Sequence, residues 1–192
     1  MMYELPPMKK NGFTLIELVV VIVILGILAV VAAPKFMNLQ NDARNASLKG
    51  LEGSLKSALG VGYSKLVMNG LENSPYVTTR DKGKGEPDNY IFSADVGIPG
   101  CSKNAACTFY YGYPEATEET FKRLLTNMDS DWAMVRDNGH LLFTFSQFTK
   151  KVIQPDRPDI TNTVMNRDNC FITYSPPTSR NSGYKLTFTP CK

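Results

Sequence analysis

The sequence has few of the side chains that build metal and catalytic sites. It contains one histidine, His140, and four cysteines with no Cys-x-x-Cys pair among them. Zinc sites use closely spaced Cys and His ligands, and nucleophilic catalysis usually needs a base such as histidine beside the nucleophile. His140 follows the turn residues Asn138-Gly139, where we expect an exposed loop position. The sequence therefore predicts no metal, no cofactor and no enzymatic activity.

Neither sign of charge is in large excess. Charged residues make up 20% of the chain, and the formal net charge is +3. Without the first twelve residues, which hold Glu4, Lys9 and Lys10, 19 basic and 17 acidic residues remain. Nucleic-acid binding needs a strong positive field, so we expect no nucleic-acid partner.

Long apolar runs are absent except for one near the N-terminus. Leu18–Ala33 has no charged or strongly polar side chain, and Phe13–Glu17 extends the run to 21 residues before Pro34. At about 1.5 Å per residue, a helix of this length spans about 30 Å, the thickness of a bilayer core. The run predicts one membrane-spanning helix.

A secretory signal peptide or a plain membrane anchor would also contain such a run. Lys9 and Lys10 precede the run, and Val30–Ala33 could loosely serve as a signal-peptide cut site. Neither kind of segment accounts for Glu17, because a carboxylate in a membrane helix costs ~2.5–3.5 kcal/mol at the bilayer centre and usually has a partner. Glu17 is therefore a candidate functional residue.

A short motif leads into the apolar run. Lys9 to Glu17 reads KKNGFTLIE, with a basic leader, a glycine, a phenylalanine and then a glutamate. This string resembles the class III signal of type IV pilins and pseudopilins. The resemblance implies cleavage between Gly12 and Phe13 by a prepilin peptidase and N-methylation of Phe13. It also implies that Glu17 pairs with the new Phe13 amine of a neighbouring subunit during assembly.

The physical chemistry of the leader agrees with this interpretation. Gly12 has no side chain, so its backbone can lie extended in a tight peptidase cleft. Lys9 and Lys10 favour the cytoplasmic side of the membrane, which orients the helix with its C-terminal end outward. Met8 is an alternative start residue. The family implies a single-pass inner-membrane precursor in a Gram-negative bacterium, an inner-membrane assembly machinery, and a helical homo-oligomer as an extracellular pilus.

Gly26 and Pro34 interrupt the helix pattern. In a helix interior Gly costs ~1 kcal/mol and Pro ~3 kcal/mol relative to Ala. The resemblance implies that the stretch between them loosens within a filament. A simple kink at Pro34 and ordinary tolerance of Gly in membrane helices are the alternatives.

The helix is expected to continue beyond Pro34, from about Thr14 to Met68, with a stop at Asn69-Gly70. We divide the chain into a removed leader (1–12), a membrane and filament-core helix (13–33), an amphipathic continuation (34–69) and a globular head (70–192). A second helix is expected at Thr117–Met128, capped by Thr117. Its predicted buried face consists of Phe121, Leu124, Leu125 and Met128.

Strand patterns predict a sheet in the head. Trp132–Arg136 and Leu141–Phe145 flank Asn138-Gly139, a strong hairpin signal. Cys170–Tyr174 and Tyr184–Thr189 form a second expected pair. Together they predict an antiparallel sheet of about four strands packed on the helix, an α+β fold. The resemblance implies the pilin fold, with one half of the long helix protruding and a disulfide-closed loop at the C-terminus.

Two segments are expected to be loops. Leu71–Gly100 is rich in turn residues, with a short strand expected only at Tyr90–Phe92. Gln147–Asp168 contains Pro155 and Pro158 and is expected to be an inserted loop.

The four cysteines are expected to form disulfides, because the head would lie outside the cytoplasm. Of the connectivities open to them, Cys101–Cys107 and Cys170–Cys191 close the shortest loops. Free thiols or a bond between Cys101 and Cys170 would contradict this pairing. The second loop resembles the C-terminal disulfide loop of type IV pilins.

Two weaker motifs do not predict a site. Asn127, Asp129 and Asp131 match the first spacings of a calcium loop, but the required Gly and final Glu are replaced, so we expect a turn. Asn45-Ala-Ser47 is a glycosylation sequon that arises by chance more often than by use.

A finer resemblance is to the mannose-sensitive haemagglutinin (MSHA) type of major pilin. It rests on Gly12–Ala33, on Ala33–Arg44 and on Tyr111–Pro114. It implies adhesion, biofilm initiation, haemagglutination and a surface receptor that includes carbohydrate among its candidate classes. A type II secretion pseudopilin and a minor or DNA-uptake pilin are the alternatives.

Overall fold

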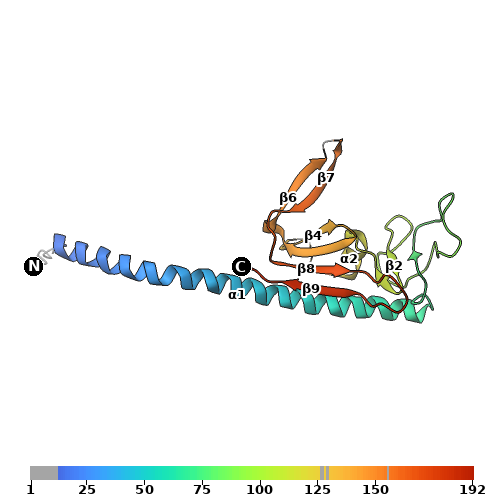
Figure 1. Ribbon diagram of the computed structural model, residues 1–192, viewed down its shortest axis with the longest axis horizontal. Coiled ribbons are helices and arrows are strands. Elements are labelled where there is room, and N and C mark those ends of the chain that lie inside the picture. Colours follow the sequence, from blue (N-terminus) through green and yellow to red (C-terminus); the bar gives the residue numbers. More distant parts are fainter. Residues whose placement is uncertain (1–12, 126–127, 129, 155) are drawn as a thin grey trace, which may run out of the picture. The chain divides into compact units, whose positions relative to one another are not determined.

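The computed structural model describes residues 13–125, 128, 130–154 and 156–192 (Figure 1). The chain divides into two compact units, one ending at Asn41 and the other running from Asp42 to Lys192. The expected leader, residues 1–12, lies outside the described residues.

A single helix, α1, runs from Leu15 to Met68 and contributes to both units. Its end has a defined cause, because Gly70 adopts a positive φ of 66° and reverses the chain. The Gly70 N–H donates to the Val67 carbonyl at 3.0 Å, and the Leu71 N–H donates to the Leu66 carbonyl at 2.9 Å. This pair of bonds is a Schellman motif, so the predicted stop at Asn69-Gly70 is confirmed.

The second unit contains a four-stranded antiparallel sheet in the order β4-β5-β8-β9 (Figure 1). The predicted hairpin is present, because Asn138 and Gly139 take φ values of 45° and 82°, as a type I′ turn requires. The α+β fold and the sheet of about four strands are thereby confirmed. The strands are β4 (Trp132–Asp137), β5 (His140–Phe145), β8 (Phe171–Ser175) and β9 (Lys185–Thr189).

The main core lies between the sheet and the part of α1 in the second unit. Leu48, Leu55 and Leu59 are fully buried there, as three- and four-residue steps along one helix face require. From the sheet, Phe143 and Tyr174 are fully buried as well. The Tyr174 hydroxyl donates to the Pro114 carbonyl at 2.6 Å, and burial raises its pKa above the ordinary value.

The segment from Leu71 to Gly100 has more structure than the expected surface loop. It contributes β1 (Val77–Thr78) to a small antiparallel sheet with β2 (Thr108–Tyr110) and β3 (Tyr113–Pro114). The strand expected near Ile91 is reduced to a single parallel bridge between Ile91 and Val77. A second core cluster includes residues of this sheet and of the segment, and it consists of Leu66, Val77, Val96, Ile98, Cys107 and Phe109.

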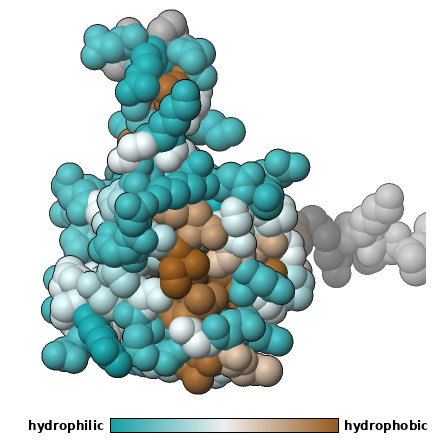
Figure 2. Space-filling view, turned by 90° about the vertical axis from the view of Figure 1, so that its right-hand side faces the viewer, coloured by the Kyte–Doolittle hydropathy of each residue, from teal (hydrophilic) through white to brown (hydrophobic). Residues whose placement is uncertain are grey.

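The prediction of a loop at Gln147–Asp168 was wrong. A short 3-10 turn, Ser146–Phe148, leads into a two-stranded hairpin of β6 (Thr149–Gln154) and β7 (Arg157–Met165). Ile153 faces Thr161 and Gln154 faces Arg157, so Pro158 falls in a register shift of the ribbon, where a proline is tolerated. Pro155 lies outside the described residues. Figure 2 shows this hairpin as a largely hydrophilic lobe on the head.

The second helix, α2, is shorter than expected and runs from Glu118 to Leu124. Leu125 is already extended, with φ −110° and ψ 132°, so the helix does not reach Met128. Thr117 occupies the N-cap position, but its side chain makes no capping bond. Phe121, Leu125 and Met128 are buried as predicted and Leu124 is partly buried, but only Phe121 and Leu124 belong to α2, so the four side chains do not form one helix face.

Candidate functional site

The N-terminal turn of α1 places the candidate residue Glu17 in a closed hydrogen-bond arrangement with Thr14. The Thr14 N–H donates to Glu17 Oε2 at 2.8 Å, and the Thr14 hydroxyl donates to the same oxygen at 2.6 Å. The Glu17 N–H donates back to the Thr14 hydroxyl oxygen at 3.4 Å. This reciprocal arrangement is a capping box, which satisfies backbone donors that a helix start leaves free.

Glu17 lies beside an apolar hollow of about 360 Å³ on this first turn. Phe13, Ile16, Val20 and Val21 supply the rest of its lining. Phe13 is 92% exposed and Ile16 is 70% exposed, so the surface around the carboxylate is apolar and is left uncovered by the described residues. A charged group in such surroundings needs a partner whenever water is removed.

The apolar run that follows Glu17 is exposed along its length. α1 contains the one stretch in the described residues that is long and apolar enough to cross a membrane, and none of that stretch is buried within the chain. Leu25 and Leu28, for example, are each 58% exposed. An apolar surface of this extent marks contact with a membrane or with other protein chains.

Gly26 and Pro34 both lie inside α1, which continues through them in the single chain. Apart from its chain neighbours and the backbone of its own helix, no described atom lies within 4 Å of the position where a Gly26 Cβ would stand, so contacts with other parts of the chain do not explain this glycine. Loosening of this stretch within a filament stays a prediction. The predicted cleavage residue Gly12 lies outside the described residues.

Both predicted disulfides are present, Cys101–Cys107 and Cys170–Cys191. The second one joins the start of β8 to the C-terminal end of the chain, and Asn45 of α1 holds the same end. The Asn45 side-chain amide donates to the Cys191 carbonyl at 3.3 Å, and the Cys191 N–H donates to Asn45 Oδ1 at 2.7 Å. Asn45 therefore has a structural role that competes with use of its sequon for glycosylation.

His140 lies in strand β5 rather than in a loop, although it is exposed as expected. Its Nδ1 shares a hydrogen bond of 2.8 Å with the Ser175 hydroxyl, and no carboxylate completes a catalytic arrangement among its hydrogen bonds in the described part of the chain. The same part contains no group of three or more His, Cys, Asp or Glu residues that could hold a metal. Of the suspected calcium turn, Asn127 and Asp129 lie outside the described residues.

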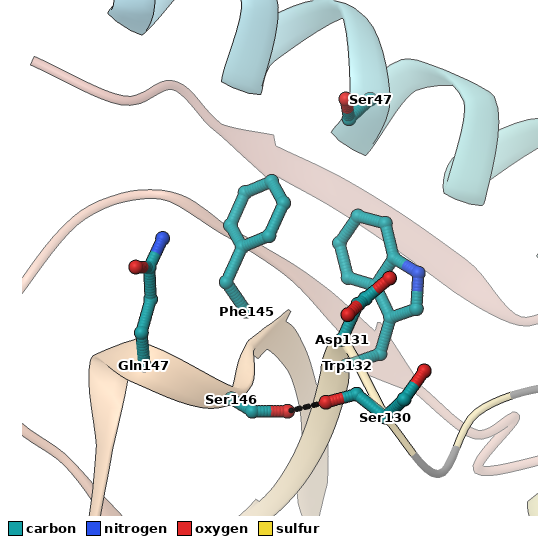
Figure 3. Close-up of a pocket in the computed structure, with 7 residues that line it drawn as sticks. All are labelled: Ser47, Ser130, Asp131, Trp132, Phe145, Ser146 and Gln147. Atoms are coloured by element: carbon teal, nitrogen blue, oxygen red, sulfur yellow. Dashed lines mark hydrogen bonds between the residues drawn. The ribbon is translucent and has the colours of Figure 1, made fainter.

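The head has a hollow of about 480 Å³ with a mixed polar and aromatic lining (Figure 3). Trp132 and Phe145 are partners across β4 and β5, and their rings stack at 4.6 Å between centroids. The Ser146 hydroxyl donates to the Ser130 carbonyl at 3.1 Å, and both residues belong to the lining. Ser47, Asp131 and Gln147 complete the lining. The hollow combines an aromatic surface with a carboxylate, a carboxamide and hydroxyls.

Sequence reasoning missed two of these features. The capping box was readable, because Thr14 and Glu17 fit the S/T-x-x-E pattern before an apolar run. The link from Asn45 to Cys191 was not readable, since 146 positions separate the two residues and no local pattern connects them.

The chain resembles known proteins mainly in its N-terminal part. Residues 7–33 match the model of the prokaryotic N-terminal methylation motif. The chain is similar to the type IV narrow pilus major component PilA5 of Thermus thermophilus, with 43% identity over 54 residues, which is 28% of this chain. The chain spans about half the length of this curated relative, 47%. No solved structure matches the chain. Both matches point to a type IV pilin-like structural subunit rather than to an enzyme.

Proposed function

We propose that this chain is the precursor of a subunit that polymerises through α1 into a type IV pilus. A prepilin peptidase cleaves it between Gly12 and Phe13, and Phe13 becomes N-methylated. The observation that carries the proposal is the uncovered apolar stretch of α1 with one carboxylate, Glu17, at its start. The methylation-motif match at residues 7–33 supports it.

The apolar stretch serves in two surroundings under this proposal. It first anchors the precursor in the inner membrane, with the leader in the cytoplasm and the head outside. It then packs against the same stretch of other copies in an extracellular fibre. Glu17 guides the exchange by pairing with the Phe13 amine of a neighbouring copy, because an unpaired charge in an apolar fibre core is strongly unfavourable.

The test replaces Glu17 and measures insertion, cleavage and fibre yield separately. Glu17→Ala should insert and be cleaved normally but lower the fibre yield at least about tenfold, since breaking a buried charge pair costs about 3–5 kcal/mol. Glu119→Ala is the matched control, because Glu119 is an exposed carboxylate on α2 of the head. A normal fibre yield from Glu17→Ala would remove this role.

At a finer level we propose an MSHA-type major pilin of a Gram-negative bacterium that acts in surface attachment, biofilm initiation and haemagglutination. The resemblance at Ala33–Arg44 and Tyr111–Pro114 supports this level. A carbohydrate receptor fits the hollow at Trp132, because an aromatic ring can pack on the apolar face of a sugar while neighbouring carboxylate and amide groups bond its hydroxyls. Attachment that free sugars do not inhibit, and that Asp131→Asn leaves unchanged, would contradict the carbohydrate proposal.

Electron microscopy of the cell surface separates the pilus proposal from a type II secretion pseudopilin. Abundant long fibres made of this chain are the expected result. Short periplasmic assemblies with secretion defects on deletion would instead favour the pseudopilin. Binding of DNA by the fibres at physiological salt would favour a DNA-uptake pilin.

A further inference from the structure

The β6–β7 hairpin and the edge strand β4 of the main sheet line a second hollow of the head, of about 530 Å³. Its volume lies within the range of about 300–1,000 Å³ that small-molecule sites occupy. This hairpin groove is lined by Glu118 of α2, Arg136 of β4, Lys151 of β6 and Thr161, Asn162, Thr163 and Val164 of β7. Among these described lining residues only Val164 is apolar, so the groove suits a polar ligand.

The register of the hairpin turns one lysine and two threonines to the same face. Lys151 and Thr163 are partners across β6 and β7, and Thr161 lies two residues before Thr163 in β7. Side chains two residues apart in a strand point to the same face. Threonine is β-branched, so few χ1 rotamers are open to it and its hydroxyl has little freedom to lose when a ligand binds. The hairpin thus offers one ammonium group and two restricted hydroxyls.

The charges at the groove leave two cations available to a ligand. Glu118 is already paired, because Lys122 Nζ donates to its Oε2 at 2.9 Å. Arg136 lies 3.8 Å from the Glu115 carboxylate, which is beyond hydrogen-bond distance. Lys151 belongs to none of the ion pairs found between described residues. An anionic group in the groove would therefore gain charge-assisted hydrogen bonds.

We propose that the hairpin groove binds a saccharide that carries a carboxylate. Arg136 and Lys151 hold the carboxylate, and the planar guanidinium suits its two oxygens. The Thr161 and Thr163 hydroxyls and the Asn162 carboxamide bond the sugar hydroxyls, because each of these groups can both donate and accept a hydrogen bond.

This site differs in place and in chemistry from the hollow beside Trp132. The two linings share no described residue, and the described lining of the hairpin groove contains no aromatic ring. Every residue of the groove belongs to the second unit of a single chain. The inference therefore goes beyond the proposed function and can be tested whether or not the chain forms fibres.

The test titrates trigalacturonic acid and, separately, N-acetylneuraminic acid into the full-length chain in detergent and measures binding by calorimetry. At least one of them should bind saturably, and its binding should weaken as salt is added, because salt screens exposed charge pairs. The same sugar with its carboxyl groups reduced to alcohols should bind at least about tenfold more weakly, since the charge-assisted bonds are lost. No saturable binding of either acid would overturn the inference.

Two neighbouring lysines provide a matched pair of variants. Lys151→Gln should weaken binding about tenfold, as expected for the loss of a hydrogen bond to a charged group. Lys150→Gln is the control and should leave binding within about twofold, because successive side chains of a strand point to opposite faces and Lys150 is not among the lining residues. Both variants remove one positive charge from an exposed position of β6. Trp132 fluorescence should show that both remain folded.

Three further results would overturn the inference. An equal loss in the two lysine variants would show that net charge alone attracts the sugars. Binding of inorganic phosphate as tight as that of the acidic sugars would reduce the groove to a simple anion site. A loss of binding in Asp131→Asn, with none in Lys151→Gln, would place the sugar in the hollow beside Trp132. Binding with the expected variant pattern by a chain that forms no fibres would support the inference while the proposed function fails.

Discussion

The same residue type has opposite surroundings in the two units that α1 joins. Leu48, Leu55 and Leu59, in the second unit, are 0% exposed, whereas Leu15 and Leu25 in the first unit are 80% and 58% exposed. The leucines of α1 in the head are thus buried by the rest of the chain, whereas the leucines of the N-terminal stretch stay exposed. Burial of a leucine side chain contributes about 1.5–3 kcal/mol, so the first unit depends on lipid or on other copies for energy that the head obtains by itself.

The largest expected effect comes from making the same Leu→Ala substitution in both units and comparing the loss of stability. Leu55→Ala should lower the free energy of unfolding of the head by about 2–5 kcal/mol, because it leaves a cavity in the main core. Leu39→Ala, at a position that is 62% exposed on the same helix, should change it by less than about 0.5 kcal/mol.

The measurement is denaturant unfolding of the full chain in detergent, followed by Trp132 fluorescence. Trp132 is the one tryptophan of the sequence and lies in the head, so its signal reports on that unit. An equal loss of unfolding free energy in the two variants would contradict the comparison, because Leu39 would then contribute as much to stability as the buried Leu55.

A second prediction concerns the covalent closure of the head. Removing Cys170–Cys191 with a double serine variant should cost about 3 kcal/mol, because the bond closes a loop with a sequence separation of 21 residues. Removing Cys101–Cys107, with a separation of 6, should cost about 2 kcal/mol by the same loop-entropy relation. Unfolding midpoints of the two variants under oxidising conditions give the order. The reverse order would show that native contacts, rather than loop length, set the effect.

A third prediction concerns the junction of α1 with the C-terminal end. Asn45→Ala removes both hydrogen bonds to Cys191 and should destabilise the head by about 1–3 kcal/mol. Asn38→Ala, at an exposed position of α1 in the first unit, is the control and should have no measurable effect. A glycan mass on Asn45 of the purified protein would contradict the structural role assigned to this side chain.

The features that could be predicted from the sequence are those that depend on residues close together in the chain. The stop of α1 at Asn69-Gly70 and the turn at Asn138-Gly139 depend on neighbouring residues, and the structure has both. The disulfide pairs followed from loop length. The β6–β7 hairpin was missed because Pro155 and Pro158 were taken as strand breakers, although Pro158 falls in a register shift of the ribbon, where a proline is tolerated.

The candidate site shows the same division. The apolar run and Glu17 were evident from the sequence, since length and a lone charge are properties of a continuous segment. The spacing of Thr14 to Glu17 also predicts a capping bond within the chain, but the family resemblance gave Glu17 only a partner on another subunit. The contact of Asn45 with Cys191 needed the fold, because only packing brings the two residues together.

The most direct test of assembly through α1 is the mass of the mature protein taken from surface fibres. We predict a chain that begins at Phe13, carries one added methyl group on its amine and keeps the whole apolar stretch of α1. A fibre protein that retains residues 1–12, or one cleaved after Ala33 so that the apolar stretch is gone, would contradict this prediction.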